Sequence, residues 1–162
     1  MTNERDMADA ILRICQEKRL MVATAESCTG GMIAAALTEI AGSSAVVDRG
    51  FVTYSNAAKM AMLGVREDTL SGHGAVSEET ARQMAEGALA HSDADIAVSV
   101  TGIAGPTGAT PGKPLGLVWF GLARKGAATK AEKHLFDGDR AAVRKSACLI
   151  GLRLLVEAAQ AN

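Results

Sequence analysis

The sequence has few cysteines and aromatic residues, and it has no long apolar run. Its three cysteines, Cys15, Cys28 and Cys148, include no Cys-x-x-Cys pair, so they indicate neither a disulfide framework nor a zinc site. No stretch reaches the roughly 18 consecutive apolar residues of a membrane-spanning helix, and the polar first residues lack the pattern of a signal peptide. We therefore expect reduced thiols, no catalytic metal, no membrane partner and a cytoplasmic protein.

Neither sign of charge is in excess. The chain has 17 Lys and Arg against 18 Asp and Glu, which gives a formal net charge of −1. Such a chain offers no basic field to hold a nucleic-acid backbone, so nucleic acid is not an expected partner. A length of 162 residues with 48% hydrophobic and 22% charged residues is typical of one globular domain, which we place at residues 1–162.

Short apolar runs alternate along the chain with segments of helical periodicity. This alternation predicts an α/β fold, a single-domain three-layer α/β/α sandwich with a mixed, largely parallel sheet. Residues 71–74, Ser-Gly-His-Gly, are expected to form a loop. The expected strands cover residues 20–25, 46–54, 96–100, 117–123 and 129–136, the last as a polar edge; the expected helices cover residues 3–18 and 57–63 and begin near Gly30, Ser77 and Asp139.

Three polar turns each follow one of these strands, at residues 27–31, 54–59 and 101–108. In open α/β sheets, ligands bind beyond the carboxyl ends of the strands. Because the three turns fall at such ends, we expect them to meet and form a binding site.

Ser27 lies on the first of these turns, between a strand and a helix. A hydroxyl there lies near the free N–H groups and positive dipole end of the next helix, which can stabilise an oxyanion. Gly30 and Gly31 would let the backbone approach a ligand closely. The same residues also fit an ordinary strand–helix junction with Ser and Thr caps.

A serine nucleophile needs a base, and no histidine is well placed to supply one. His73, His91 and His134 lie in a glycine loop, at a helix end and in a polar strand, where surface or structural roles are expected. Lys59 is the better candidate, because the start of a helix disfavours an ammonium and favours the neutral amine. The alternative is a solvated lysine that extends outward. Tyr54, the only tyrosine, lies five residues before it.

Other residues near these turns offer weaker candidates. Cys28 could replace Ser27 as the nucleophile, because a helix N-terminus lowers the pKa of a thiol, or it could simply be buried against the sheet. The glycine loop after Thr101 matches no nucleotide fingerprint, although its N–H groups could bind a phosphate. Arg140, beside the helix cap Asp139, could bind an anion or be a surface charge.

Seven motifs follow one another along nearly the whole chain. They are Ala25-Glu26-Ser27-Cys28-Thr29-Gly30-Gly31, Ala41-Gly42-Ser43-Ser44, Arg49-Gly50-Phe51-Val52-Thr53-Tyr54-Ser55-Asn56, Gly64-Val65, His73-Gly74-Ala75-Val76-Ser77, Gly102-Ile103-Ala104-Gly105-Pro106 and Gly138-Asp139-Arg140. In this order they resemble the CinA C-terminal domain family. One departure is Ala109, where the family often has a second glycine after Gly108.

The resemblance implies the activity of the family's stand-alone members, which are nicotinamide mononucleotide amidohydrolases. It implies a metal-free serine hydrolase without a cofactor, in which Ser27 is the nucleophile, Lys59 the base and Tyr54 an assisting proton shuttle. The small-molecule nucleotide would be the partner, and the chain would act alone or as a homo-oligomer. The expected substrate contacts are Thr29, Gly30 and Gly31 in the first turn and, carried over from the family, Asn56, Thr101, Gly102 and Arg140.

Two other functions remain open from the sequence. One is a nucleotide-binding or regulatory module that keeps the pocket without the reaction. The other is an amidase that depends on Cys28. Ammonia release by the wild-type chain distinguishes the first from an enzyme, and the effect of Ser27→Ala distinguishes the second.

Overall fold

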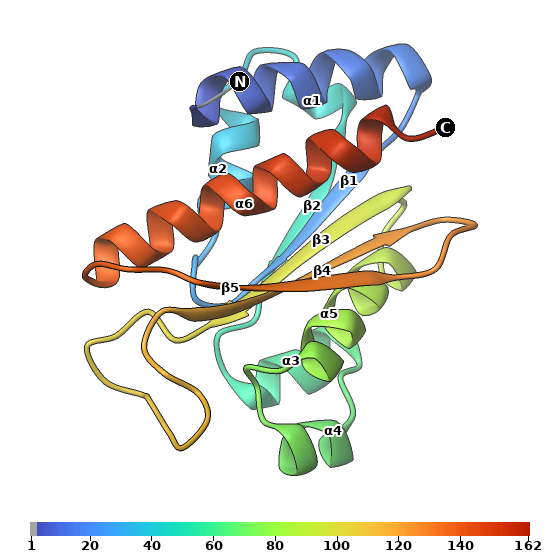
Figure 1. Cartoon of the computed structure of the whole chain (residues 1–162). Coiled ribbons are helices and arrows are strands. Elements are labelled where there is room, and N and C mark those ends of the chain that lie inside the picture. Colours follow the sequence, from blue (N-terminus) through green and yellow to red (C-terminus); the bar gives the residue numbers. More distant parts are fainter. Residues whose placement is uncertain (1–2) are drawn as a thin grey trace.

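Helices lie on both faces of a five-stranded sheet in the computed structural model, which describes residues 3–162 (Figure 1). The strands are β1 (Val22–Glu26), β2 (Val47–Val52), β3 (Ile96–Gly102), β4 (Leu117–Arg124) and β5 (Lys130–Leu135). The helices are α1 (Glu4–Lys18), α2 (Met32–Thr38), the 3-10 turn η1 (Ser43–Ala45), α3 (Asn56–Leu63), α4 (Glu67–His73), α5 (Glu78–Ala90) and α6 (Arg140–Gln160).

The strands follow the order β2-β1-β3-β4-β5 across the sheet. Strand β1 pairs in parallel with β2 and β3, whereas β4 is antiparallel to both β3 and β5. Every strand except β4 therefore points the same way. This confirms the predicted mixed, largely parallel sheet, and the polar β5 forms one edge as expected.

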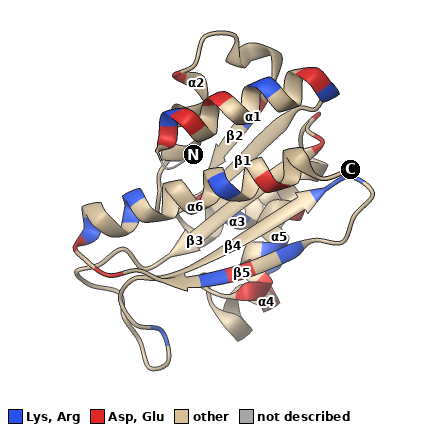
Figure 2. Ribbon diagram, turned by 45° about the horizontal axis from the view of Figure 1, so that its top comes forward, with Lys and Arg blue, Asp and Glu red and all other residues tan. Residues whose placement is uncertain are grey.

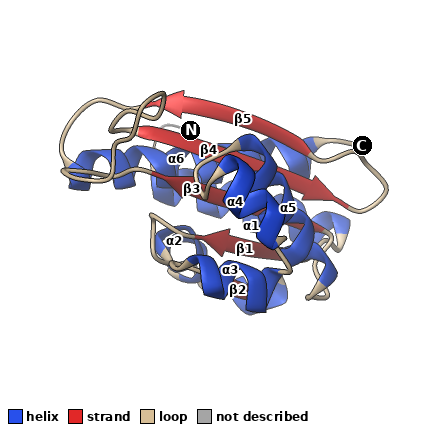
Figure 3. Ribbon diagram, turned by 90° about the horizontal axis from the view of Figure 1, so that it is seen from below, coloured by secondary structure: helices blue, strands red, loops and turns tan. Residues whose placement is uncertain are grey.

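The helices form two layers. Helices α1, α2 and α6 cover one face of the sheet, and α3, α4 and α5 cover the other (Figures 1 and 3). Along β1 the side chains alternate, so that Val22 packs into the core under α1 and α6 while Ala23 and Ala25 pack into the core under α5. The same alternation turns Glu26 toward α2 and Ser27 toward α3.

Two glycines let α5 pack unusually close to its neighbours. A Cβ atom at Gly87 would lie 1.9 Å from the carbonyl oxygen of Leu63, the last residue of α3. A Cβ atom at Gly121 of β4 would lie 2.3 Å from the carbonyl oxygen of Ala81. Both distances are far below a van der Waals contact, so only glycine fits, and the close approach fixes α3 against α5.

Helix α4 corrects one sequence prediction. Residues 71–74 were expected to form a loop, but residues 71–73 are the last turn of a helix. Glu67 and Asp68 lie in its first turn, where carboxylates stabilise a helix, and Leu70 is buried. The helix ends at His73, and the positive φ of 82° at the next residue, Gly74, turns the chain away from the helix axis. The turn-forming residues therefore mark the end of a helix and not a free loop.

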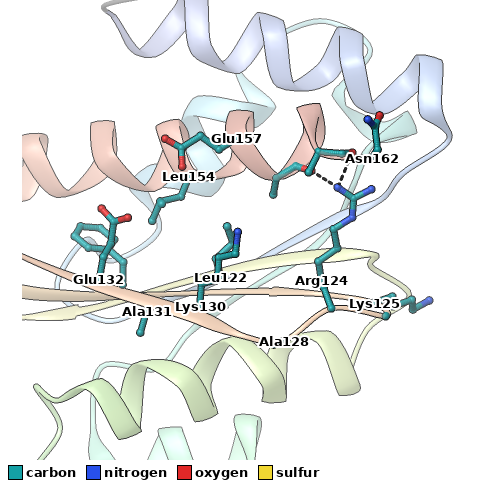
Figure 4. Close-up of a pocket in the computed structure, with 15 residues that line it drawn as sticks. Leu122, Arg124, Lys125, Ala128, Lys130, Ala131, Glu132, Leu154, Glu157 and Asn162 are labelled. Carbon is teal, nitrogen blue, oxygen red and sulfur yellow. Dashed lines mark hydrogen bonds between the residues drawn. The ribbon is translucent and has the colours of Figure 1, made fainter.

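Basic and acidic residues are interspersed on the outer elements, as α1 and β5 show (Figure 2). A hollow of about 250 Å³ lies between the C-terminal half of α6 and the strands β4 and β5, where Leu154 and Glu157 face Leu122 and Lys130 (Figure 4). No predicted site residue lines it. Within residues 3–162, the helices are too short or too polar to cross a membrane.

Candidate active site

The three predicted turns meet at one edge of the sheet. Because β1, β2 and β3 run in parallel, the residues that follow them lie side by side. Ser27 directly follows β1, and its N–H donates to the carbonyl of Val100 in β3 at 3.0 Å. Thr53, the residue after β2, donates its N–H to the carbonyl of Glu26 at 2.9 Å. These bonds extend the sheet by one residue and hold the turns together.

Lys59 contacts Ser27 directly. Its Nζ lies 3.1 Å from Ser27 Oγ, and it also donates to the carbonyl oxygens of Thr53 at 2.9 Å and Tyr54 at 3.2 Å. The side chain of Ser55 caps α3 by accepting from the N–H of Ala58 at 3.0 Å. This cap starts the helix where Lys59 falls in its first turn, pointing back at Ser27.

Burial of Lys59 acts against its charged form. The residue is only 1% exposed, and burial lowers the pKa of its amine. The Nζ atom uses two of its three free tetrahedral positions to donate hydrogen bonds to the carbonyls of Thr53 and Tyr54. The remaining direction faces Ser27 Oγ, where a neutral amine can accept the hydroxyl proton.

The phenol of Tyr54 does not lie beside Ser27 and Lys59, where a proton shuttle is expected. Within residues 3–162, its oxygen makes no hydrogen bond to Ser27 or Lys59, and the residue is 60% exposed. The phenol oxygen instead accepts from Arg140 Nη2 at 2.8 Å, while Arg140 Nη1 donates to the carbonyl of Gly105 at 2.9 Å. Arg140 therefore links the loops after β2 and β3, and Tyr54 reaches Lys59 only through its backbone carbonyl.

The start of α2 corrects one part of the expected oxyanion site. The N–H groups of the helix after Ser27 were expected to be free, but those of Ile33 and Ala34 donate to the carboxylate of Glu26 at 2.9 and 3.1 Å. Thr29 Oγ1 also donates to this carboxylate, at 2.6 Å. Glu26 is fully buried, so the anion at this helix start belongs to the protein. This role of Glu26 was not predicted from the sequence, although an acidic residue directly before a strand–helix turn is a signal for it.

The turn after Ser27 is also held from the opposite end of the chain. Arg144 of α6 donates from Nε to the carbonyl of Cys28 at 3.0 Å and from Nη2 to that of Thr29 at 3.4 Å. Gly30 donates its N–H to the carbonyl of Ser27 at 3.0 Å. Sequence reasoning missed Arg144, and its only signal was its position one helical turn after Arg140.

The remaining predicted substrate contacts divide into two groups. Gly30 and Gly31 have φ values of 59° and 108°, so the turn requires their left-handed backbone. Asn56 lies exposed in the first turn of α3. By contrast, Thr101 Oγ1 donates to the carbonyl of Ala75 at 2.8 Å. Its hydroxyl therefore holds a neighbouring loop in place.

Gly102 ends β3, where a Cβ atom would lie 2.6 Å from Val118 Cγ2. Its lack of a side chain therefore serves the packing of β3 on β4. Gly102 therefore has a structural role, and only its backbone could contact a substrate.

The environment of Cys28 disfavours a thiol nucleophile. Burial raises the pKa of the Cys28 thiol to about 11, which reverses the lowered pKa expected from a helix N-terminus. None of the three histidines contacts Ser27 or Cys28: His73 lies near Glu79, His91 bonds to the Gly87 carbonyl and His134 bonds to Glu132. Among residues 3–162, no three His, Cys, Asp or Glu side chains gather as metal ligands would.

A hydroxyl in contact with a buried amine is an arrangement suited to acyl transfer. The amine can take the proton of Ser27 as the hydroxyl attacks and later return it to a leaving group. Glu26 and Arg144 hold the two residues that directly follow Ser27, because Glu26 accepts from Thr29 and Arg144 donates to the carbonyl of Cys28.

The chain is similar over most of its length to known proteins. The model of the CinA C-terminal domain matches residues 4–159. The chain is 58% identical over 132 residues to the nicotinamide-nucleotide amidohydrolase PncC of Enterobacter agglomerans, covering 82% of this chain and 80% of that protein. It is 54% identical over 134 residues to PncC of Escherichia coli K12, covering 83% and 81%.

Longer proteins and solved structures also match. A putative competence-damage inducible protein of Symbiobacterium thermophilum is 48% identical over 162 residues, and the match covers 95% of this chain but 38% of that protein. The crystal structure of competence/damage inducible protein CihA from Agrobacterium tumefaciens superimposes with a TM-score of 0.92 at 50% identity, covering 95% of this chain and 94% of that one.

Proposed function

Since the chain belongs to the CinA C-terminal domain family, we propose that it is a nicotinamide-nucleotide amidohydrolase that converts nicotinamide mononucleotide and water to nicotinate mononucleotide and ammonia. The relatives named PncC, which match over most of their length, support the substrate and the reaction. The observation that carries the proposal is the contact of 3.1 Å between Lys59 Nζ and Ser27 Oγ, away from bulk water.

In the proposed reaction, Ser27 Oγ attacks the carboxamide carbon of the substrate. The neutral amine of Lys59 accepts the hydroxyl proton, and the carboxamide oxygen becomes an oxyanion. Lys59 then passes its proton to the nitrogen as the carbon–nitrogen bond breaks, so that ammonia leaves and an ester remains on Ser27. Water attacks this ester with Lys59 again as base, which releases the carboxylic acid and restores the hydroxyl.

This cycle needs no metal and no cofactor, and it requires only Lys59 to move protons. Tyr54 and Arg140 would then contact the substrate. Their hydrogen bond of 2.8 Å lies on the exposed side of the site, from which the substrate would enter. Asn56 and the turn that contains Gly30 and Gly31 complete the proposed contacts. We further propose that the enzyme acts on the free nucleotide in the cytoplasm, without nucleic acid or membrane.

An assay with nicotinamide mononucleotide tests this function. Wild-type protein incubated with a metal chelator should release ammonia and an equal amount of nicotinate mononucleotide. Ser27→Ala should bind the nucleotide and release no ammonia. If the wild-type protein binds the nucleotide and releases no ammonia, the chain is a binding module and the proposal is wrong. If the chelator abolishes ammonia release, the reaction depends on a metal.

A further inference from the structure

Two arginines at the start of α6 lie beside the site without an acidic partner. Arg140 and Arg144 are one helical turn apart, so their side chains share one side of the helix (Figure 2). In the part of the chain that the structure describes, neither guanidinium forms an ion pair with Asp or Glu. The neighbouring Asp139 instead caps α6 by accepting from the N–H of Ala142 at 2.9 Å. The start of α6 therefore carries two positive charges that no ion pair offsets.

Both guanidinium groups bond to the site and still have donors to spare. Arg144 donates to two backbone carbonyls of the turn after Ser27. Arg140 donates to the carbonyl of Gly105 and to the phenol of Tyr54. Since a guanidinium has five N–H donors, each arginine keeps three of them free, counted over residues 3–162. Arg140 is exposed and Arg144 is half-buried, so a ligand can reach both.

The free donors lie near Ser27 and Lys59 but do not contact them. Arg144 bonds to the carbonyl of the residue that directly follows Ser27. Arg140 bonds to the phenol of Tyr54, whose backbone carbonyl accepts from Lys59, so the length of a tyrosine side chain separates Arg140 from Lys59. In nicotinamide mononucleotide, the pyridine ring and the ribose separate the carboxamide from the phosphate. The arrangement therefore suits a substrate whose carboxamide lies at Ser27 and whose phosphate lies at the start of α6.

We propose that Arg140 and Arg144 together bind the phosphate of the substrate, and that this contact makes the enzyme prefer a nucleotide to its nucleoside. The inference rests on the proposed function and adds to it the part of the substrate that each arginine binds. A guanidinium offers two parallel N–H donors that match the oxygens of a phosphate. Because the phosphate takes no part in the bond changes, this contact is equal in the ground state and the transition state. It therefore lowers KM without raising kcat.

The test compares two substrates that differ only in the phosphate, nicotinamide mononucleotide and its dephosphorylated nucleoside. Ammonia release is measured with the wild type, Arg140→Gln, Arg144→Gln and the control Lys145→Gln. Lys145 follows Arg144 in α6, is exposed, and makes no hydrogen bond or ion pair within the described residues. The control thus removes one positive charge from the same helix, as the two test variants do.

The arginine variants should lose discrimination between the two substrates. We expect KM for the mononucleotide to rise about 10- to 100-fold in Arg140→Gln and in Arg144→Gln, the range for loss of a hydrogen bond to a charged group. The value of kcat should stay near that of the wild type, and kcat/KM for the nucleoside should change little. Lys145→Gln should match the wild type with both substrates. The nucleoside also reports on the fold, because a distorted turn after Ser27 would slow both reactions.

Binding without turnover separates this inference from the proposed function. In protein that carries Ser27→Ala, calorimetry measures the Kd for the mononucleotide with and without Arg144→Gln. The second substitution should weaken binding about 10- to 100-fold, whereas Lys145→Gln in the same background should not. If the wild type releases no ammonia but this difference in Kd is found, the proposed amidohydrolase function is wrong and the phosphate site stands.

Three outcomes would overturn the inference. Equal losses of kcat/KM with both substrates would show that the two arginines only shape the site. An unchanged KM and Kd for the mononucleotide in the arginine variants would show that the phosphate binds elsewhere. An equally large effect of Lys145→Gln would show a general attraction of the anion to α6 and no defined site.

Discussion

Lys59 Nζ lies 3.1 Å from Ser27 Oγ, although 32 positions separate the two residues in the chain. The contact exists because β1 and β2 are parallel neighbours, so the turn after one strand meets the helix after the other. Strand alternation turns Ser27 toward that helix, and the Ser55 cap sets where the helix begins. The proposed chemistry depends on this contact between the hydroxyl and the amine.

The pH dependence of activity should report the deprotonation of Lys59. Burial lowers the pKa of its amine below the ordinary value of 10.5, and the reaction needs the neutral form. We therefore expect kcat/KM to rise with pH through the lowered pKa and then level off. A profile of kcat/KM against pH, with folding checked at each pH, measures this limb. A limb at the ordinary lysine pKa, or a fall in this range, would contradict the role of Lys59 as base.

The same group makes stability depend on pH. Since the pKa of Lys59 is lower in the folded protein, the unfolded chain binds more protons between that pKa and 10.5. The free energy of unfolding should therefore rise with pH across this window. Denaturant unfolding of the wild type and Lys59→Met at several pH values measures the contribution as the difference in slope. Equal slopes would mean that Lys59 is charged in the folded protein.

Removal of the Cys28 thiol should leave the reaction intact. The pKa of about 11 keeps this buried thiol protonated at neutral pH, so Cys28→Ala should turn over close to the wild type. An alkylating reagent should likewise leave the folded enzyme active and modify Cys28 only after unfolding. Loss of activity in both experiments, with Ser27→Ala still active, would instead establish the Cys28-dependent amidase.

Tyr54→Phe should affect substrate binding more than turnover. The variant loses the hydrogen bond to Arg140 but keeps the backbone carbonyl that accepts from Lys59. We therefore expect KM for nicotinamide mononucleotide to rise while kcat stays near the wild-type value. Steady-state kinetics measure the two constants separately. A collapse of kcat at unchanged KM would restore the proton-shuttle role that the family resemblance implies.

Gly87→Ala should destabilise the fold. The new Cβ would lie 1.9 Å from the carbonyl oxygen of Leu63, so α3 and α5 must separate, at an expected cost of about 1–3 kcal/mol. Gly72→Ala is the matched control, because its Cβ meets nothing within 4 Å and it lies in helix α4. The control should gain about 0.5–1 kcal/mol. Denaturant unfolding compares the two, and equal effects would contradict the close packing.

The sequence predicted the elements whose signals are local. Caps and apolar periodicity located α1, α3, α5 and α6, and their N-caps, Asn3, Ser55, Ser77 and Asp139, all accept hydrogen bonds from helix N–H groups. Helix α4 was missed because it is short and ends in turn-forming residues. The meeting of Ser27 and Lys59 could be expected, since it follows from parallel strands and needs no side-chain detail.

Features that depend on side-chain direction could not be predicted. The sequence does not show whether the phenol of Tyr54 points to Lys59 or to Arg140. Arg144 lies 116 positions from Cys28, and an arginine on a long helix is usually a surface charge. Glu26 was part of a recognised motif, but only the geometry shows that its carboxylate occupies the start of α2. The directions of all three side chains depend on contacts between segments that are distant in the sequence.

The role of Ser27 as the nucleophile is tested by the rate of ammonia release from nicotinamide mononucleotide by Ser27→Ala, beside the wild type and Cys28→Ala. Melting temperatures of the three proteins should be similar. We expect Ser27→Ala alone to lose several orders of magnitude in turnover, in the range found when a serine nucleophile is removed. Turnover by Ser27→Ala close to that of the wild type would contradict it.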